Sequence, residues 1–301
     1  MGSLASDPAM TLTVATYNLL DLFDPKDERK IDALAEVVRR LDADVIAFQE
    51  VGSIDALRAI LAKSGGGFSD PVVGRADKRG IACAIASKRA VLDVAVLDAA
   101  TLPFPAFHED DPAPFGARLR LRRSIPVVRI DGGHLGAITF LSLHWKSRRA
   151  TPLTLRDGTD HEPTTVAERA AGDLRSLVQR AAEALFLRKG IDEILAARPT
   201  DAVCVCGDFN DVSGSVPLEV VLGEGEGMLE DVGLRVPVAD RWSVLHGGAP
   251  AAIDHVLLTP GIAKQVQNAR FLNDGLLDPD ALPEGTPVLP SDHAPLVVTL
   301  L

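Results

Sequence analysis

The apolar run 203–206 ends at Gly207 and is followed by three polar residues, Asp208, Asn210 and Asp211. Asp208 and Asn210 stand two positions apart, so their side chains project to the same side if the chain stays extended. A carboxylate beside an amide can orient a water molecule and hold an oxyanion. A turn rich in Asp and Asn is the ordinary alternative after a strand, and other groups in the chain have to decide between the two.

Two aspartate and histidine pairs stand in the last third of the sequence. Asp254 and His255 lie inside the apolar run 252–258, where at least one of them must be paired because an isolated charge is costly to bury. Asp292 and His293 lie between a long loop and the closing apolar run. A histidine held by a carboxylate can stay protonated and donate to a phosphoryl oxygen. These pairs therefore favour a site that binds phosphate.

Two apolar runs in the first part of the chain also end in polar side chains. Asn18 ends the run 12–17, where an amide is more often a turn former than a ligand. Glu50 stands near the end of the run 44–51, where a carboxylate is costly unless it meets a cation or a donor. Exposure of Glu50 at the strand tip and a role in metal binding are equally good interpretations of its position.

A basic patch follows the apolar run 135–143. His144 leads into it, Trp145 is expected to be exposed, and Lys146, Arg148 and Arg149 supply the positive charge. Arginine and lysine bind phosphate oxygens well, so a phosphate could settle here in an otherwise acidic protein. A solvated loop is the alternative.

Hard carboxylate and amide oxygens dominate these groups, and they suit Mg²⁺ or Mn²⁺. No group has the Cys and His spacing of a zinc site. The chain has only three cysteines, of which Cys204 and Cys206 share one face of a predicted strand. They predict buried thiols in a reducing compartment rather than a disulfide framework.

The elements that must position these groups can be read from the periodicity of apolar residues. Residues 30–41 predict a helix with one buried face, and residues 164–197 predict helices with a break at Gly190. Strands are predicted at 12–17, 44–51, 80–87, 90–97, 118–122, 135–143, 203–206, 252–258 and 296–300. We expect 90–97 to be the neighbour of 80–87. We expect 118–122 to show three arginines on one face, which is usually a solvated face and in a minority of cases a track for substrate phosphates.

The composition is that of an ordinary soluble globular protein, with 47% hydrophobic and 24% charged residues. A net charge of -11 argues against coating nucleic acid by bulk electrostatics, but not against a small basic pocket. No apolar stretch is long enough to span a membrane. Residues 1–10 do not resemble a signal peptide and are interpreted as a tail or an expression remnant. We expect a cytoplasmic monomer with no protein partner, while export with removal of a signal stays open.

Six motifs together resemble the endonuclease/exonuclease/phosphatase superfamily of metal-dependent phosphoesterases, which includes DNase I-like nucleases, neutral sphingomyelinases and inositol polyphosphate phosphatases. Each motif is short, but all six occur in the order that the family has and they span nearly the whole chain. They are Thr16-Tyr17-Asn18, Phe48-Gln49-Glu50-Val51, Ser142-Leu143-His144-Trp145-Lys146-Ser147, Gly207-Asp208-Phe209-Asn210-Asp211, Ile253-Asp254-His255 and Ser291-Asp292-His293-Ala294-Pro295.

The resemblance implies a four-layer α/β sandwich, in which two mixed sheets pack face to face between outer helices. Residues 11–301 would form a single catalytic domain, with the site where the strand tips converge. The residue roles are likewise implied by the resemblance alone. Glu50 would be the main metal ligand with Asp292 near the metal, and Asn18 would bind metal or phosphate. Asp208 would activate the attacking water, and Asn210 would steady the phosphate. Asp254 would hold His293 against a phosphoryl oxygen, and the remaining residues that face the substrate would be His144, Lys146 and Arg148.

The sequence departs from the common family pattern at His255, where a tyrosine is frequent, so a core role and a role beside the site are both open for this residue. The chain has one tyrosine, Tyr17, and it lacks the tyrosine that some abasic-site endonucleases place by the phosphate. His144 takes the comparable place, which favours nuclease-like or sphingomyelinase-like members.

Three functions fit the sequence. The first is hydrolysis of a phosphodiester by in-line attack of water with Mg²⁺ or Mn²⁺, most simply by a nuclease acting on DNA or RNA. The second is hydrolysis of a smaller or lipid-derived phosphoester, which the acidic balance supports. The third is a binding module that reuses the fold, which the costly polar cluster disfavours.

Overall fold

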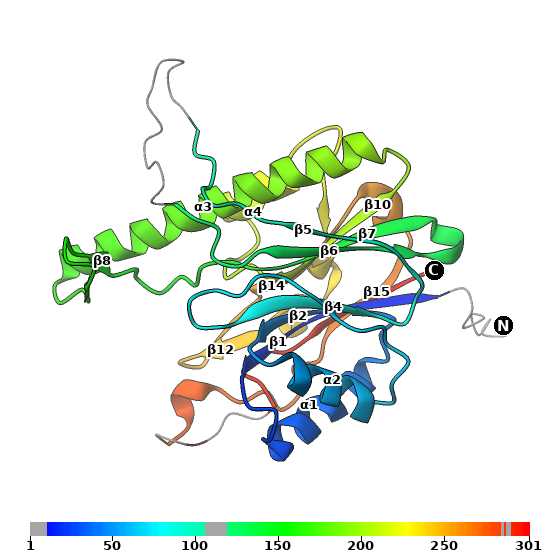
Figure 1. Cartoon of the computed structure of the whole chain (residues 1–301), viewed down its shortest axis with the longest axis horizontal. Helices are drawn as coiled ribbons and strands as arrows, with labels where there is room; N and C mark the ends of the chain where they lie inside the picture. The colour runs from blue at the N-terminus through cyan, green and yellow to red at the C-terminus, as the bar shows by residue number, and fades with distance from the viewer. Residues whose placement is uncertain (1–10, 106–118, 284–285, 287–289) are drawn as a thin grey trace.

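Two six-stranded mixed sheets form the centre of the computed structural model, which describes residues 11–105, 119–283, 286 and 290–301 (Figure 1). The first sheet has the order β15 (Val266–Phe271), β16 (Leu296–Leu300), β1 (Leu12–Leu22), β2 (Val45–Val51), β4 (Ala82–Ser87) and β3 (Val72–Val73). The second has the order β11 (Glu230–Asp231), β14 (Asp254–Leu258), β10 (Ala202–Asp208), β7 (Ala137–His144), β6 (Ile125–Asp131) and β5 (Val91–Leu97). Two small hairpins pair β8 (Leu153–Thr154) with β9 (Asp160–His161) and β12 (Val244–His246) with β13 (Ala249–Ala251).

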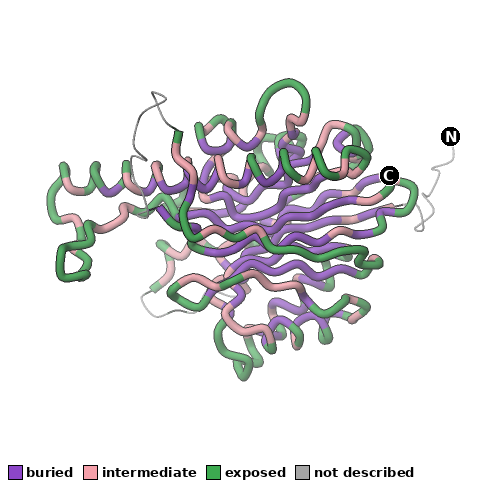
Figure 2. The backbone as a smooth tube through the Cα atoms, turned by 45° about the horizontal axis from the view of Figure 1, so that its top comes forward, coloured by how far each residue is buried: buried purple, intermediate pink, exposed green. Residues whose placement is uncertain are grey.

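Helices cover the outer faces of the two sheets, so the architecture is the predicted α/β sandwich (Figure 1). The α-helices are α1 (Glu28–Leu41), α2 (Ile54–Lys63), α3 (Val166–Ala197), α4 (Val216–Leu222) and α5 (Pro260–Ala263). Short 3-10 helices are η3 (Gly133–Leu135), η4 (Val232–Arg235), η5 (Val238–Asp240) and η6 (Pro279–Ala281). The buried backbone runs through both sheets and the inner faces of the helices (Figure 2).

The alternation of side chains along the strands builds two sides of the second sheet. Cys204 and Cys206 on β10 face the first sheet and belong to the core between the two sheets, whereas Val203 and Val205 pack on the side of α3 and α4. The predicted burial of all three cysteines is confirmed. Burial raises the pKa of the Cys83 thiol to about 12, which makes this thiol chemically inert.

The helix predicted at 30–41 is confirmed, and it begins two residues earlier. Its N-cap is Asp27, whose side chain accepts from the backbone N–H of Lys30, and its last turn carries two arginines. Its periodic apolar positions, among them Ile31 and Leu34, are buried against the first sheet. Periodicity and capping are both local signals, so this helix could be read from the sequence alone.

Two predictions about strands are wrong. Residues 91–97 form β5, which is not the neighbour of β4 but pairs with β6 at the edge of the other sheet. The segment 119–122 is not a strand, and its Leu119 and Leu121 are instead buried against α3. Arg118 lies outside the described residues. Alternation of arginine and leucine needs only one buried side, which a helix can provide as well as a sheet.

The predicted break at Gly190 is also wrong, because α3 is one continuous helix of 32 residues. A Cβ atom at Gly190 would lie 2.7 Å from Cδ1 of Leu97 at the end of β5. The glycine therefore allows the close approach of a strand rather than ending the helix. Among the described residues, no helix has the length and apolar character needed to cross a membrane.

The strand directions bring the ends of several strands to one edge. β1 runs parallel to β2 in the first sheet, and β7 runs parallel to β10 in the second. A 3.0 Å contact between the side chains of Asn18 and Asp208 places the C-terminal ends of the two pairs at the same edge. The pairing register sets Asp208 opposite His144 on one side and opposite Asp254 on the other. Close packing at this point requires Gly207, because a Cβ there would lie 2.2 Å from the carbonyl oxygen of Leu143.

Candidate active site

The backbone is strained where β1, β2 and β10 reach the common edge. Positive φ angles occur at Leu20 (51°), Asp21 (50°), Glu50 (60°) and Asn210 (51°), which are four of the five such non-glycine residues among those described. The register of β1 with β2 shifts between Asn18 and Leu22. Such strain persists only where surrounding contacts hold it, and it concentrates at functional sites.

Asn18 joins the two sheets at this edge. Its amide nitrogen Nδ2 lies 3.0 Å from Oδ2 of Asp208 and 3.4 Å from Oε1 of Glu50, so it donates toward carboxylates of both sheets. Its Oδ1 accepts from the backbone N–H of Leu20 at 3.0 Å. The other oxygen of Glu50 accepts from the backbone N–H of Asp21 at 2.8 Å. The amide and the turn after it therefore fix two carboxylates that would otherwise repel each other.

Asp208 is held from several directions. Its Oδ1 accepts from the backbone N–H of Asn210 at 2.9 Å, and the left-handed conformation of Asn210 makes this short turn possible. The side-chain amide of Asn210 donates to the carbonyl of Trp145 at 3.1 Å, while the N–H of Trp145 donates to the carbonyl of Asp208 at 3.0 Å. The turn after β10 and the turn after β7 are thus tied together.

Two histidines face Asp208. Nε2 of His144 lies 3.3 Å from Oδ2 of Asp208 and 3.9 Å from Oε1 of Glu50. His293 makes a 2.8 Å contact between Nδ1 and Oδ2 of Asp254, and its Nε2 lies 3.9 Å from Oδ2 of Asp208. In the structure, Asp254 and His293 are therefore paired as predicted, and the pair lies beside the carboxylate of Asp208.

These groups have pKa values far from their ordinary ones. Burial, with Asp254 and Glu50 adding to it and His293 opposing it, raises the pKa of Asp208 to about 7. Burial would lower the pKa of His293, but Asp254 and Asp208 overcome it and raise it to about 10. Burial, together with Arg123 and His293, lowers the pKa of His144 well below 6.5. Near neutral pH the site thus holds a charged and a neutral histidine on either side of a carboxyl group that can gain or lose a proton.

Lys146 and Arg148 do not join this cluster. The ammonium group of Lys146 donates to the carbonyls of Ser147 (2.9 Å) and Arg149 (2.8 Å) and lies 3.1 Å from the hydroxyl of Ser147. The pKa of Lys146 is lowered to about 8, mainly by burial and to a smaller extent by the nearby arginines. Arg148 is exposed, and its side chain has no hydrogen bond or ion pair with any described residue. The expected exposure of Trp145 is wrong, because this ring is 2% exposed and packs edge to face on Phe209 at 4.7 Å.

Several supporting residues were not predicted from the sequence. Arg123 and Asp77 form a buried ion pair at 2.8 Å, and Arg123 also donates to the carbonyl of His144 at 2.8 Å. Gln49 on β2 donates to the hydroxyl of Ser142 on β7 at 3.3 Å and so links the sheets beneath the site. Gln49 and Ser142 each lie in one of the six motifs quoted above, and this position was the only sign in the sequence that they support the site. Arg123 is part of a basic run that gives no indication of its partner.

The donor set fits a divalent cation of the magnesium type. Oδ1 of Asp292 is buried without a hydrogen-bond partner, as is Oδ1 of Asp254. Among the described residues no three side chains from His, Cys, Asp and Glu form a closed metal cage. Mg²⁺ is commonly held by one or two carboxylates, with waters and substrate phosphate completing its shell. Glu50 would supply the protein part of such a shell together with Asp292. Asn18 would add its oxygen only by turning its amide over, because Nδ2 faces Glu50 and Oδ1 accepts from the backbone N–H of Leu20.

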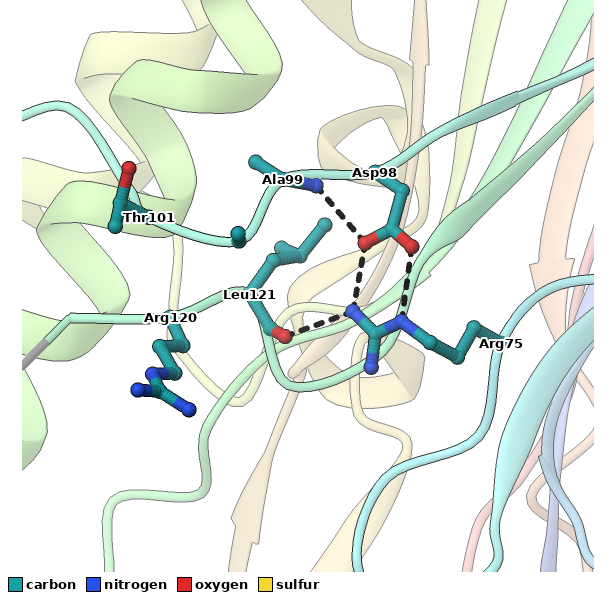
Figure 3. Close-up of a pocket in the computed structure, with 7 residues that line it drawn as sticks. Arg75, Asp98, Ala99, Thr101, Arg120 and Leu121 are labelled. Atoms are coloured by element: carbon teal, nitrogen blue, oxygen red, sulfur yellow. Dashed lines mark hydrogen bonds and ion pairs between the residues drawn. The ribbon is translucent and has the colours of Figure 1, made fainter. Parts of the chain in front are cut away.

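A separate hollow of about 530 Å³ shares no residue with this cluster (Figure 3). Arg75 lines this hollow together with Arg120, and it bonds to Asp98 through Nε (2.8 Å) and Nη2 (2.6 Å) and to the carbonyl of Leu121 (3.0 Å). Asp98 thus neutralises Arg75, and none of the side chains of the candidate site reaches this hollow.

A model of the endonuclease/exonuclease/phosphatase family matches residues 15–293 of this chain. The chain belongs to the endonuclease/exonuclease/phosphatase family. Members of this family are phosphoester hydrolases and generally depend on a divalent metal. No curated protein matches the sequence significantly.

Solved structures of the family share the fold of this chain. The mannosyl-6-phosphatase Bt3783 of Bacteroides thetaiotaomicron superposes with a TM-score of 0.63 at 18% identity, covering 96% of this chain and 99% of that one. A family protein from the same organism gives 0.61 at 18% identity over 96% and 97%. Truncated TDP2 of Caenorhabditis elegans gives 0.56 at 18% identity, also over 96% and 97%. At these identities the likeness concerns the fold alone.

Proposed function

We propose that this protein is a divalent-metal-dependent phosphodiesterase in which Asp208 activates the attacking water. The observation that carries the proposal is the position of Asp208 between His144 and His293, with Asn18 linking it to Glu50. Residues 11–301 would act as one catalytic domain. The metal, held by Glu50 with Asp292 or Asn18, would polarise a phosphoryl oxygen and offset the negative charge of the phosphate.

The side chains of this chain would divide the remaining work. Asp208, with a pKa of about 7, is matched to accept a proton from water near neutral pH. The water oxygen bonds to phosphorus as the bond to the leaving oxygen breaks on the opposite side, so no covalent enzyme intermediate forms. His293, which Asp254 keeps protonated, would donate to a phosphoryl oxygen. Asn210 bonds Trp145 with one amide hydrogen and would direct the second at the phosphate.

A nuclease acting on DNA or RNA is the first candidate within this reaction class, because the exposed Arg148 and Arg149 lie four and five positions after His144. A hydrolase of a small or lipid-derived phosphoester is the second. The inward orientation of Lys146 favours the second, since its ammonium group is occupied by backbone carbonyls and not available to a polyanion.

Hydrolysis of a paired substrate panel tests the proposal. Supercoiled plasmid, a small chromogenic phosphodiester and its monoester would each be incubated with Mg²⁺, Mn²⁺ or EDTA. We expect metal-dependent turnover that falls by at least about 100-fold in Asp208→Ala and Glu50→Ala. Asp192→Ala, which removes an exposed carboxylate on α3, is the matched control and should retain full activity. Turnover of Asp208→Ala within a few-fold of the wild type would refute the proposal.

A further inference from the structure

Helix α3 carries four buried polar side chains, those of Ser176, Gln179, Arg180 and Glu183. Gln179, Arg180 and Glu183 are only 9%, 5% and 2% exposed. Charged side chains are almost never this buried unless they are paired. No step of the proposed reaction uses them, so their partners show what they do.

Arg180 bridges the two turns that carry the central groups of the site. Its Nε donates to Oδ2 of Asp211, in the turn after β10, at 2.9 Å. Its Nη1 donates to the carbonyls of Lys146 (3.4 Å) and Ser147 (3.3 Å), in the turn after β7. A guanidinium has five donors in a fixed plane and can hold partners in two directions at once, which an ammonium group cannot do with the same geometry.

Neighbouring residues of α3 hold the same turn. Glu183 accepts from the backbone N–H of Lys146 at 3.0 Å, and its second oxygen accepts from Gln179 at 2.8 Å. One turn earlier in the helix, the hydroxyl of Ser176 donates to the carbonyl of Arg149 at 2.6 Å. The turn after β7 is therefore fastened to α3 through its backbone groups.

Asp211 is held from its other side by the histidine whose role the sequence left open. Nε2 of His255 lies 3.0 Å from the carbonyl oxygen of Asp211, and Nδ1 lies 2.9 Å from Oδ2 of Asp231. His255 is thus a buried support for the turn after β10. Arg180, Asp211 and His255 form one chain of contacts that crosses beneath both turns.

We propose that Arg180 is a positioning residue, whose guanidinium sets the turn after β7 against the turn after β10 and thereby sets His144 against Asp208. This inference rests on the proposed hydrolytic function. Among the described residues, two other hydrogen bonds join the two turns, and both are made by the backbone of Trp145, with residues 208 and 210. The pairing of β7 with β10 sets the backbone of His144 opposite that of Asp208, and Arg180 adds the side-chain bridge that holds the two turns beyond these strand ends, next to the 3.3 Å contact of His144 with Asp208. Misplacement of reacting groups by about 1 Å can cost about 100-fold in rate.

Trp145 makes this arrangement observable. It lies in the turn that Arg180 holds, and the only other tryptophan is Trp242. In a Trp242→Phe background the emission therefore reports Trp145, which is buried against Phe209. We would compare Arg180→Gln, Arg180→Lys and Asp211→Asn in this background. The matched control is Arg188→Gln, two turns along the same helix, where the arginine bonds Asp192 and the carbonyl of Val221.

Arg180→Gln should lower kcat by about 10- to 100-fold with a change in KM below about threefold, because the reacting groups and not the binding surface are displaced. Its Trp145 emission should move to longer wavelength and become accessible to acrylamide. Arg180→Lys should recover part of kcat through the ion pair with Asp211. Arg188→Gln should leave kcat and the emission unchanged even if it lowers the melting temperature.

The proposal is overturned if Arg180→Gln folds with kcat within threefold of the parent and with unchanged emission, or if Arg188→Gln loses as much kcat. Should Arg180→Gln fail to fold, Asp211→Asn decides by the same two readouts, since it keeps the shape of the side chain. A parent that hydrolyses nothing in the substrate panel would refute the proposed function instead, and the emission of Trp145 would then decide the positioning role alone.

Discussion

At the scale of single residues, the pair formed by His255 and Asp231 makes stability depend on pH. Burial lowers the pKa of His255, but Asp231 outweighs burial and raises it above 6.5. Burial likewise raises the pKa of Asp231, but His255 and its other donors bring it below 3.8. The histidine contribution is complete below pH 6.5 and is lost as the pH rises through its raised value. The aspartate contribution is present above pH 3.8 and is lost as the pH falls.

Asp231→Asn should therefore lower the free energy of unfolding most between about pH 4 and pH 6.5, by about 3 kcal/mol, because it leaves a buried histidine without its counter-charge. The loss should become smaller as the pH is raised further. Urea unfolding of both proteins at a series of pH values measures it. Asp192→Asn, at an exposed pair, should cost less than about 1 kcal/mol at every pH. A deficit for Asp231→Asn that does not change with pH would contradict the coupling.

Asn18 offers a second test at this scale, because it places an amide between two carboxylates, 3.0 Å from Asp208 and 3.4 Å from Glu50. Asn18→Asp replaces that donor by a third negative charge. In EDTA this variant should be less stable than the wild type by about 1–3 kcal/mol, since like charges then face one another.

A divalent cation should offset that repulsion. We expect Mg²⁺ to raise the melting temperature of Asn18→Asp by more than it raises that of the wild type. Asn18→Ala is the control, because it removes the donor without adding charge. Equal effects of Mg²⁺ on Asn18→Asp and Asn18→Ala would speak against a cation at this position.

At the scale of elements, two glycines at close contacts between elements should differ in how well they tolerate a larger side chain. A Cβ at Gly207 would lie 2.2 Å from the carbonyl oxygen of Leu143, a backbone atom that can move only if β7 moves. A Cβ at Gly190 would meet Cδ1 of Leu97 at 2.7 Å, which is the end of a flexible side chain. The first contact joins the two strands that carry His144 and Asp208, and the second joins a helix to an edge strand.

Gly207→Ala should consequently cost several kcal/mol of stability, about 3 or more, and abolish hydrolysis. Gly190→Ala should change stability by less than about 1 kcal/mol, because the gain in helix propensity offsets the displacement of Leu97. Thermal unfolding and turnover of the two variants side by side measure the difference. Equal stability losses would show that strand spacing does not depend on Gly207.

The elements that the sequence predicts well are those whose signal is local. The helix at 28–41 has a cap and a clean apolar face, and β16 was predicted at its observed bounds, 296–300. The strand predicted at 90–97 is observed as β5, but its assignment to a sheet depends on pairing with β6, a distant segment of the chain in which Ile125 pairs with Leu97 and Ile130 with Val91. The alternation of apolar and polar residues along a strand indicates which of its faces is buried, but it does not indicate which other strand pairs with it.

The same distinction separates the parts of the site. Asn18, Glu50 and Asp208 are predictable because each stands at the end of an apolar run, where parallel strands end together. His293 is predictable for another reason, because it forms an Asp-His pair directly before the closing apolar run. Arg180 and Glu183 are not, because within α3 they look like ordinary exposed charges interleaved with alanine and leucine. Only the packing of that helix on the turn after β7 shows that they are buried.

At the scale of the whole molecule, charge determines which substrate can approach. The net charge is -11, and many arginines are committed to ion pairs, among them Arg39, Arg58, Arg123 and Arg129. Arg148 and Arg149 differ, because both are exposed and neither guanidinium has a bond to a described residue. They lie four and five positions beyond His144, at the edge where the strand tips meet. A polyanion could therefore gain contacts there that a small ester does not need.

Arg148→Ala combined with Arg149→Ala should weaken plasmid binding and nicking about 10-fold or more at low salt. It should reduce the slope of log affinity against log salt by about 1.8, since each lost phosphate contact contributes about 0.9. Turnover of the small phosphodiester should change far less, because that substrate does not extend beyond the strand tips. Arg39→Ala combined with Arg58→Ala removes the same charge from α1 and α2 and is the matched control. If both double variants lower nicking equally, net charge alone governs the approach of the substrate, and a nuclease would have to bind its strand on another surface.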